Sequence, residues 1–567
     1  MIPPLTRLTQ RLKRAFRRAP QPSLPPLRPA ASTAAQADEF RRRVVTVAEG
    51  VHVAIGYGLA NAILLEGTDR TILVDTLESV EAAREVKAAF DKLSAKPLQA
   101  IILTHHHTDH ISGAGVWGAD QPLEVIAHAT LTAQMDRVAD ILRPIISRRS
   151  LRQFGVYLGE AAAGAGIGLA LRTNAQASMA PLRPTRTFDE QLNLEIAGLR
   201  LELIHTPGET DDQISIWLPD KRVMISADNY YRAFPNLYAI RGTAYRDVMQ
   251  WVHSLDRVRD YRPDILIPGH GRPVFGAETI YLALTDYRDA IQYVHDQTVR
   301  GMNAGLTPDE LVARLQLPPH LAQSPHLVEV YGSVAWSARA IFDGYLGWFN
   351  GQPSSLEPLP PARRAAHLSA LAGGVEGLHQ AAAHALAAHE WQWALELTDA
   401  ALGLDSADSV ARQQRVQALT ALGDGHPNAN ARNYYLTSAL ELQGLEIPII
   451  RPSQSAPAVI QAMPLSLFFA ALAVRLNPDK SQAVDQCVGF HFPDCATDYT
   501  LHVRRGVAEV RPRFPERPDI TVTLPSTLWK EMLAGLRSPA TTLVSGEVQV
   551  AGGVWSLARV LALFEQD

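Results

Sequence analysis

The chain has 567 residues, of which 47% are hydrophobic and 20% are charged, and its formal net charge is -5. This length exceeds what one hydrophobic core supports, so we expect roughly three or four domains. The composition is that of an ordinary globular protein, without the basic excess that would indicate nucleic-acid binding. Two cysteines are too few for a disulfide scaffold or a thiolate metal site, so any metal must be held by histidine and carboxylate.

Residues 1–39 form a basic leader that becomes rich in Pro and Ala. The leader lacks the apolar core of a signal peptide, and no stretch of the chain approaches the roughly 20 apolar residues of a membrane span. A cytoplasmic location is therefore the expectation. Two interpretations of the leader stay open. It is either a disordered basic segment or a short amphipathic surface helix with Leu5, Leu8, Leu12 and Phe16 on its apolar side.

Residues 40–277 alternate short β-branched runs with helical or loop segments. The runs near 52, 61 and 71 follow one another closely, which predicts an antiparallel meander. Further strands are expected near 100, 123, 199, 213, 222 and 264, and helices near 79–93, 130–142 and 244–260. The pattern predicts an α/β domain in which helices cover two sheets.

Residues 278–446 have helical periodicity throughout. The stretch 379–423 alternates small and large apolar residues in the manner of tetratricopeptide-like helix pairs. Because one such unit buries its own face poorly, we expect it to contribute an oligomer interface.

Residues 456–567 combine strand-like and helical runs and predict an α+β module. Seven apolar positions in this module have two possible roles, because they either line a groove for an alkyl tail or form an ordinary core. These are Val488, Phe490, Phe492, Leu528, Trp529, Met532 and Leu536.

The motif THHHTDH at 104–110 directly follows the apolar run LQAIIL. Residues two apart on an extended turn point the same way, so His105 and His107 can converge on one metal while Asp109 and His110 reach a second. The side chain of His106 should point away from its neighbours, which favours a supporting role. Four candidate ligands in one turn indicate a two-metal centre rather than a solvated loop.

Three other stretches also follow strands: HTPGETDDQ at 205–213, ISADNYY at 225–231 and IPGHGRP at 267–273. Together with THHHTDH they resemble the metallo-β-lactamase superfamily, whose αββα sandwich carries its ligands at strand ends. The resemblance implies that His105, His107 and Glu209 hold one zinc, that Asp109, His110 and His270 hold the other, and that Asp228 bridges them. Most of the superfamily has His where this chain has Glu209, and Asp211 and Asp212 are alternative ligands nearby.

Glu209 after TPG, together with ADN at 227–229 and NLYAIRG at 236–242, resembles the alkyl sulfatase branch of that superfamily. The domain order agrees, since members have a helical dimerisation domain and then a sterol-carrier-like module. The resemblance implies a homodimer. It also implies that Asn236, Arg241 and Tyr238 bind the substrate, with Asn236 and Arg241 on the sulfate oxygens. Arg suits such an oxyanion because its planar guanidinium donates two parallel hydrogen bonds.

The implied reaction is hydrolysis of an alkyl sulfate ester by a hydroxide that two zinc ions generate, with Asp109, Asn236 and Arg241 as catalytic residues. Some relatives carry a His shortly after the Arg as the leaving-group acid, whereas this chain offers Tyr245 or Arg246. Attack at sulfur and attack at carbon both stay open. Two other functions remain: hydrolysis of another ester, lactone or phosphodiester, and a carrier role with a vestigial metal site. The segments 148–159 and 163–171 are either a lining for the alkyl chain or plain loops.

Overall fold

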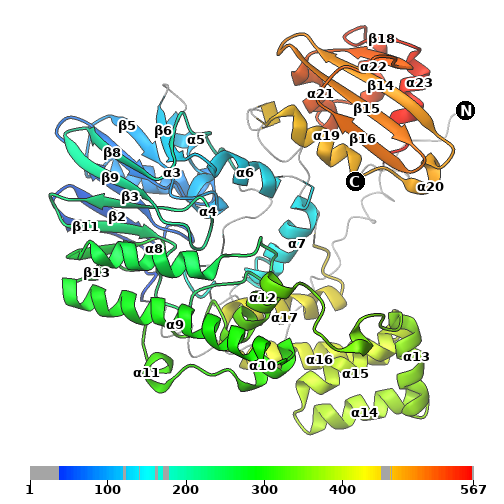
Figure 1. Ribbon diagram of the computed structural model, residues 1–567, viewed down its shortest axis with the longest axis horizontal. Coiled ribbons are helices and arrows are strands. Elements are labelled where there is room, and N and C mark those ends of the chain that lie inside the picture. The colour runs from blue at the N-terminus through cyan, green and yellow to red at the C-terminus, as the bar shows by residue number, and fades with distance from the viewer. Residues whose placement is uncertain are drawn as a thin grey trace, which may run out of the picture. The chain divides into compact units, whose positions relative to one another are not determined.

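Figure 1 shows the computed structural model, which describes residues 38–118, 123–139, 141–159, 164–169, 171, 178–447, 460, 461 and 463–564. All but the last two residues of the predicted leader lie outside this part. The chain divides into two compact units. One contains the described residues within Leu151–Ala163 and Pro353–Pro448, and the other contains those within Ala35–Ser150, Gly164–Gln352 and Ile449–Asp567. None of the helices in the described ranges combines the length and the apolar character needed to cross a bilayer.

The first sheet has seven strands in chain order, antiparallel from β1 to β4 and parallel from β4 to β7. The predicted meander is confirmed as β2 to β4. The strands are β1 (Arg43–Ala48), β2 (Val51–Ile55), β3 (Ala62–Glu66), β4 (Thr71–Val74), β5 (Leu98–Ile102), β6 (Glu124–His128) and β7 (Arg186–Phe188).

The second sheet has six strands in the order β13, β12, β11, β10, β9, β8. Its only parallel pair is β11 with β12, so the carboxyl ends of these two strands lie side by side. The strands are β8 (Gln191–Ile196), β9 (Leu199–His205), β10 (Ile214–Leu218), β11 (Val223–Ala227), β12 (Ile265–Pro268) and β13 (Val274–Phe275).

The two sheets pack face to face with helices on both outer sides, which confirms the predicted αββα sandwich. In β3, Ile63 and Leu65 face the second sheet, while Leu64 packs with α3 (Val80–Phe90). On the other outer side, α8 (Val248–Asp260) and α9 (Ala277–Asn303) cover the second sheet, as Figure 1 shows in green. Because both faces of each sheet are buried, the central strands are continuously apolar instead of alternating.

The predicted boundary between residues 277 and 278 falls at the start of α9. The core on the outer side of the second sheet continues past this point, because Leu321, Leu327, Val334 and Ile341 belong to it as well. Leu321 lies in α11 (Pro319–Ala322), and Val334 and Ile341 lie in α12 (Val334–Leu346), which packs against α10 (Pro308–Arg314).

The helical unit places each helix against the next along the chain. Its core is made largely of alanine and leucine, which allows the helices to approach closely. The helices are α13 (Pro361–Leu371), α14 (Val375–Ala387), α15 (Trp391–Leu404), α16 (Ser409–Gly425) and α17 (Ala429–Leu442).

The C-terminal module is the predicted α+β unit, with a five-stranded sheet in the order β16, β15, β14, β17, β18. Six of the seven apolar positions named for it lie in its own core, and only Leu536 is exposed. The ring of Trp529 lies 4.8 Å from that of Phe490, so the packing favours the core role over the groove. The elements are α19 (Leu465–Ala473), β14 (Asp485–Phe492), β15 (Thr497–Arg504), β16 (Val507–Arg511), β17 (Ile520–Thr523), α21 (Ser526–Leu533), α22 (Pro539–Val544), β18 (Gln549–Ala551) and α23 (Val554–Leu561).

Candidate metal centre

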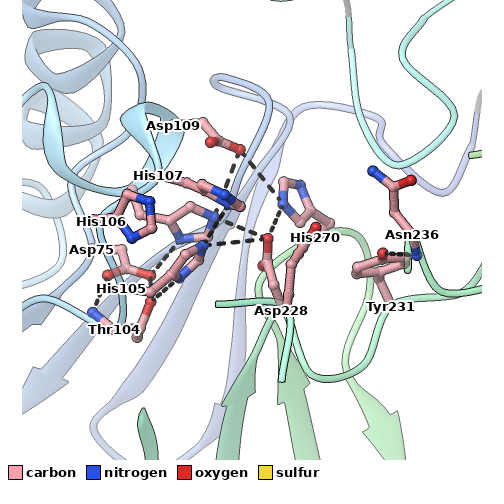
Figure 2. Close-up of polar contacts among 12 residues, drawn as sticks. Asp75, Thr104, His105, His106, His107, Asp109, Asp228, Tyr231, Asn236 and His270 are labelled. Carbon is pink, nitrogen blue, oxygen red and sulfur yellow. Dashed lines mark hydrogen bonds and ion pairs between the residues drawn. The ribbon is translucent and has the colours of Figure 1, made fainter. Parts of the chain in front are cut away.

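The THHHTDH motif turns from the buried end of β5 into the short helix α4 (Thr108–Ile111). His107 has extended backbone angles immediately before α4, so it points the same way as His105. His105 Nε2 lies 3.0 Å from His107 Nδ1, and Figure 2 shows the two rings together. His106 points elsewhere, with its Nδ1 2.8 Å from Asp212 Oδ1, which agrees with the predicted supporting role.

Two groups of potential ligands meet at this turn. In each group the ligand atoms all lie within 4.8 Å of one another. One group is His105, His107 and Asp228, and the other is Asp109, His110 and His270. The structure therefore brings together the local motif and the residues that follow β11 and β12.

Asp228 stands between the two groups, which is the position predicted for a bridging ligand. Its Oδ2 lies 3.7 Å from His105 Nε2, 3.4 Å from His110 Nε2 and 3.2 Å from His270 Nε2. Figure 2 shows this carboxylate facing imidazoles from both groups. The approach depends on Gly269, because a Cβ there would overlap Asp228 Oδ1.

Glu209, predicted to hold one metal with His105 and His107, belongs to neither of the two ligand groups. It lies near Asp228 in the loop after β9, and its main contact is a cation. Its Oε1 accepts a hydrogen bond from Arg246 Nη1 at 2.8 Å. Burial raises the pKa of Glu209 to about 7, with a further upward effect from Asp228, while Arg246 and Arg241 act in the opposite direction. Of the alternative ligands in this loop, Asp211 is exposed and Asp212 is paired with His106.

Buried oxygen atoms show that these residues fit a cation. Glu209 Oε2 and Asp228 Oδ1 are both buried, and neither has a hydrogen-bond partner among the described residues. Burying two neighbouring carboxylates whose oxygens lack hydrogen bonds costs free energy unless a cation binds to them. Histidine nitrogens and carboxylate oxygens are also the donors that zinc takes in proteins. The residues therefore fit a metal ion at each group.

The imidazoles differ in their electrostatic surroundings. Burial, reinforced by His110, holds the pKa of His105 well below its usual range, and burial with His105 and Arg241 does the same for His107. Burial also acts to lower the pKa of His110, but Asp228, Asp75 and Asp109 outweigh it and raise that pKa well above its usual range. The first pair is therefore neutral and able to bind a cation at neutral pH, because metal binding requires the unprotonated ring.

Asp75, which was not predicted from the sequence, stabilises the THHHTDH turn through hydrogen bonds. It follows β4, the parallel neighbour of β5, so its carboxylate lies beside the motif. The carboxylate accepts hydrogen bonds from Thr104 N at 2.9 Å and Thr104 Oγ1 at 2.8 Å, and it lies 2.7 Å from His110 Nδ1. An acidic residue at the end of the neighbouring strand is the signal that would have identified it.

The predicted sulfate-binding residues lie in the loop between β11 and α8. Arg241 Nη2 is 3.3 Å from His107 Nε2, so the guanidinium is at the edge of the first ligand group. Asn236 is 1% exposed, its N–H donates to Tyr231 Oη at 2.8 Å, and its side-chain amide atoms have no hydrogen-bond partner among the described residues. Tyr238 is partly buried in the same segment, and among the described residues no hydrogen bond joins it to the ligand groups.

The two candidates for the leaving-group acid have different surroundings. Tyr245 is 42% exposed, its ring is 6.2 Å from that of Tyr345, and burial of part of the side chain raises its pKa. Arg246 is buried against Glu209. His128 and His205 stack on each other and belong to neither ligand group.

Family comparisons agree with the geometry. The metallo-beta-lactamase superfamily matches residues 55–270, the alkyl sulfatase dimerisation family matches 307–444, and the alkyl sulfatase C-terminal family matches 453–567. A linear primary-alkylsulfatase from Pseudomonas sp. (strain ATCC 19151) is 39% identical over 88% of this chain and 98% of its own length. An (R)-specific secondary-alkylsulfatase from Pseudomonas sp. is 29% identical over 90% of this chain and 79% of its own length.

A solved structure extends the agreement to three dimensions. The stereoselective inverting sec-alkylsulfatase Pisa1 from Pseudomonas sp. superposes with a TM-score of 0.87 at 27% identity, over 94% of this chain and 87% of that one. The sandwich, the helical unit and the C-terminal module thus have counterparts in the same order in these relatives. On this evidence, the chain belongs to the alkyl sulfatase family of the metallo-beta-lactamase superfamily.

Proposed function

We propose that this chain hydrolyses alkyl sulfate esters to an alcohol and inorganic sulfate, with two zinc ions per chain. The observation that supports this most strongly is the pairing of two largely buried ligand groups with an adjacent Arg241 and with the buried side-chain amide of Asn236, which has no hydrogen-bond partner among the described residues. Zinc bound at these groups would activate water as a nucleophile at neutral pH and act as a Lewis acid. His105, His107 and Glu209 would hold one ion, and Asp109, His110 and His270 would hold the other, with Asp228 shared.

The protein's own residues would bind and orient the ester. Arg241 and Asn236 would bind the sulfate oxygens, since a guanidinium and an amide supply the hydrogen bonds that an oxyanion accepts. Placed beside His107, Arg241 would also stabilise the negative charge that develops on the departing sulfate. Three ligand carboxylates bring a centre of two dications close to neutrality, so the separate cation Arg241 matters more for binding the anionic substrate.

The proposal also includes a homodimer formed through the helical unit. The match to the alkyl sulfatase dimerisation family covers 307–444, which contains α13 to α17. Several large apolar side chains of these helices are exposed in the single chain, among them Leu371 at 85% and Trp393 at 51%. Exposed apolar surface of this kind is typical of a face that a partner covers.

The test of the proposed activity is sulfate release from dodecyl sulfate by purified protein, with zinc content measured by elemental analysis on the same sample. We expect two zinc ions per chain, and we expect release to fall by about a hundredfold or more in Arg241→Ala because a charge-assisted contact to the transition state is lost. Arg200→Ala is the matched control, since Arg200 is an exposed arginine of the same sandwich. If the protein binds two zinc ions but releases no sulfate, the metal centre is supported but the substrate is not. Other esters, lactones or phosphodiesters would then be tested.

A further inference from the structure

Arg246 is a buried cation that contacts a proposed metal ligand and the sulfate-binding segment at once. The side chains of Arg246 and Glu209 are only 3% and 2% exposed, and they form an ion pair at 2.8 Å. The same Nη1 atom also donates to the backbone carbonyl of Asn236. Arg246 is held in place by its sequence neighbour Asp247, which caps the N-terminus of α8.

The chemistry of the guanidinium excludes one of the roles that the sequence left open. An arginine side chain does not give up its proton in proteins, so Arg246 cannot act as the acid that protonates the leaving group. Its contribution must be a fixed charge and a fixed set of donors.

The contact with Glu209 uses only one carboxylate oxygen. Arg246 occupies Oε1, whereas Oε2 is buried without a partner among the described residues. A carboxylate whose first oxygen is fixed by a rigid donor has its second oxygen fixed in direction as well. Hydrogen bonds of this kind to metal ligands orient the ligand and strengthen metal binding.

We propose that Arg246 is a positioning residue that holds Glu209 in the orientation in which Oε2 binds the metal, and that couples this ligand to the Asn236 segment. The assignment rests on the metal centre of the proposed function but not on the identity of the ester. Charge alone predicts the opposite effect, because a cation next to two dications repels them. Removal of Arg246 should therefore lower zinc affinity if the residue acts by orienting Glu209, and raise it if charge repulsion dominates.

The experiment measures zinc affinity of the full chain by competition with a chromophoric chelator, without any substrate. We expect Arg246→Met to weaken one of two zinc sites by about 10- to 100-fold. Arg246→Lys should show a smaller loss, since it keeps the charge and a donor but carries them on a flexible stem, unlike the planar group whose Nη1 contacts both Glu209 and Asn236. Arg200→Met is the matched control. It removes an exposed arginine of the same sandwich whose ion pair is with Asp220, and its zinc affinity should stay within about threefold of the unmodified protein.

A thermodynamic cycle keeps the assignment testable if Arg246→Met is poorly folded. Glu209→Gln combined with Arg246→Met removes both members of the buried pair, which is less harmful than removing one. In the Glu209→Gln background, Arg246→Met should cause no further loss of zinc affinity. Unchanged or tighter zinc binding in Arg246→Met, or an equal loss in both backgrounds, overturns the assignment. Unmodified protein that binds no zinc would overturn the metal centre itself, and the assignment with it.

Discussion

At the scale of single residues, the centre depends on groups that bind no substrate and no metal. Asp75 has a positive φ of 57°, a conformation that a non-glycine residue adopts only with strain. The strain accompanies a carboxylate that contacts both ends of the THHHTDH turn, at Thr104 and at His110. Asp75 therefore fixes the direction of the His110 ring, and with it the position of Nε2 near Asp228.

Replacing Asp75 by asparagine tests this role with little change of shape, because asparagine tolerates a positive φ. Asn cannot accept hydrogen bonds on both side-chain atoms, so the support of either Thr104 or His110 is lost. We expect Asp75→Asn to retain its fold by circular dichroism and to bind zinc about 10- to 100-fold more weakly in a chelator competition. Asp220→Asn, an exposed aspartate of the same sandwich, is the control. Equal zinc affinity in Asp75→Asn and the control would contradict the supporting role.

At the scale of elements, the segment 151–159 belongs to the helical unit rather than to the sandwich that precedes it in sequence. Arg152 donates two hydrogen bonds to the carboxylate of Glu441 in α17, at 2.7 and 2.9 Å. Leu158 packs on Leu436 and Leu440 of the same helix. The sequence had offered residues 148–159 as an alkyl-chain lining or a plain loop, and the structure assigns Arg152 and Leu158 a packing role.

Leu158→Ala should destabilise the helical unit. Leu158 is 8% exposed, and truncating a buried leucine costs about 2 to 5 kcal/mol because a cavity remains. Urea unfolding followed by circular dichroism measures this cost, with Leu356→Ala, a 58% exposed position of the same unit, as the control. If both variants unfold at the same urea concentration, the packing of Leu158 on α17 contributes nothing to stability.

At the scale of the whole molecule, the proposed homodimer explains apolar side chains that a monomer would leave in water. We expect Leu371→Glu, and separately Trp393→Glu, to shift the protein toward a monomer in light scattering, because a buried unpaired charge at an interface is costly. Leu93→Glu, at a 45% exposed leucine of the other unit, should leave the mass unchanged. A dimer that persists in both variants would place the interface on another face.

Individual residues show how much of the fold and of the site could be predicted from the sequence. The central strands were predictable because they are apolar throughout, whereas β1, β7, β8 and β13 were missed. No position of β1 is fully buried and half the positions of β8 are exposed, so their apolar patterns are weak. β7 and β13 have only three and two residues. In the site, the four local motif residues were predictable from spacing, and Asp228 and His270 from their places after strands. Asp75 was not predicted, although its place directly after a strand was a usable signal. Arg246 was not predicted as the partner of Glu209, because nothing in the spacing indicates which distant side chains face each other.

The sequence by itself determined the order of the three domains, the sandwich and the turn that presents His105, His107, Asp109 and His110, because backbone geometry within one turn is local. Only the tertiary structure decided that Asp75 supports His110 from 35 residues away and that Arg246 holds Glu209 from 37 residues away. These contacts depend on strand register and on how α8 packs against its sheet. Both are set by burial of the whole core rather than by any short stretch of residues.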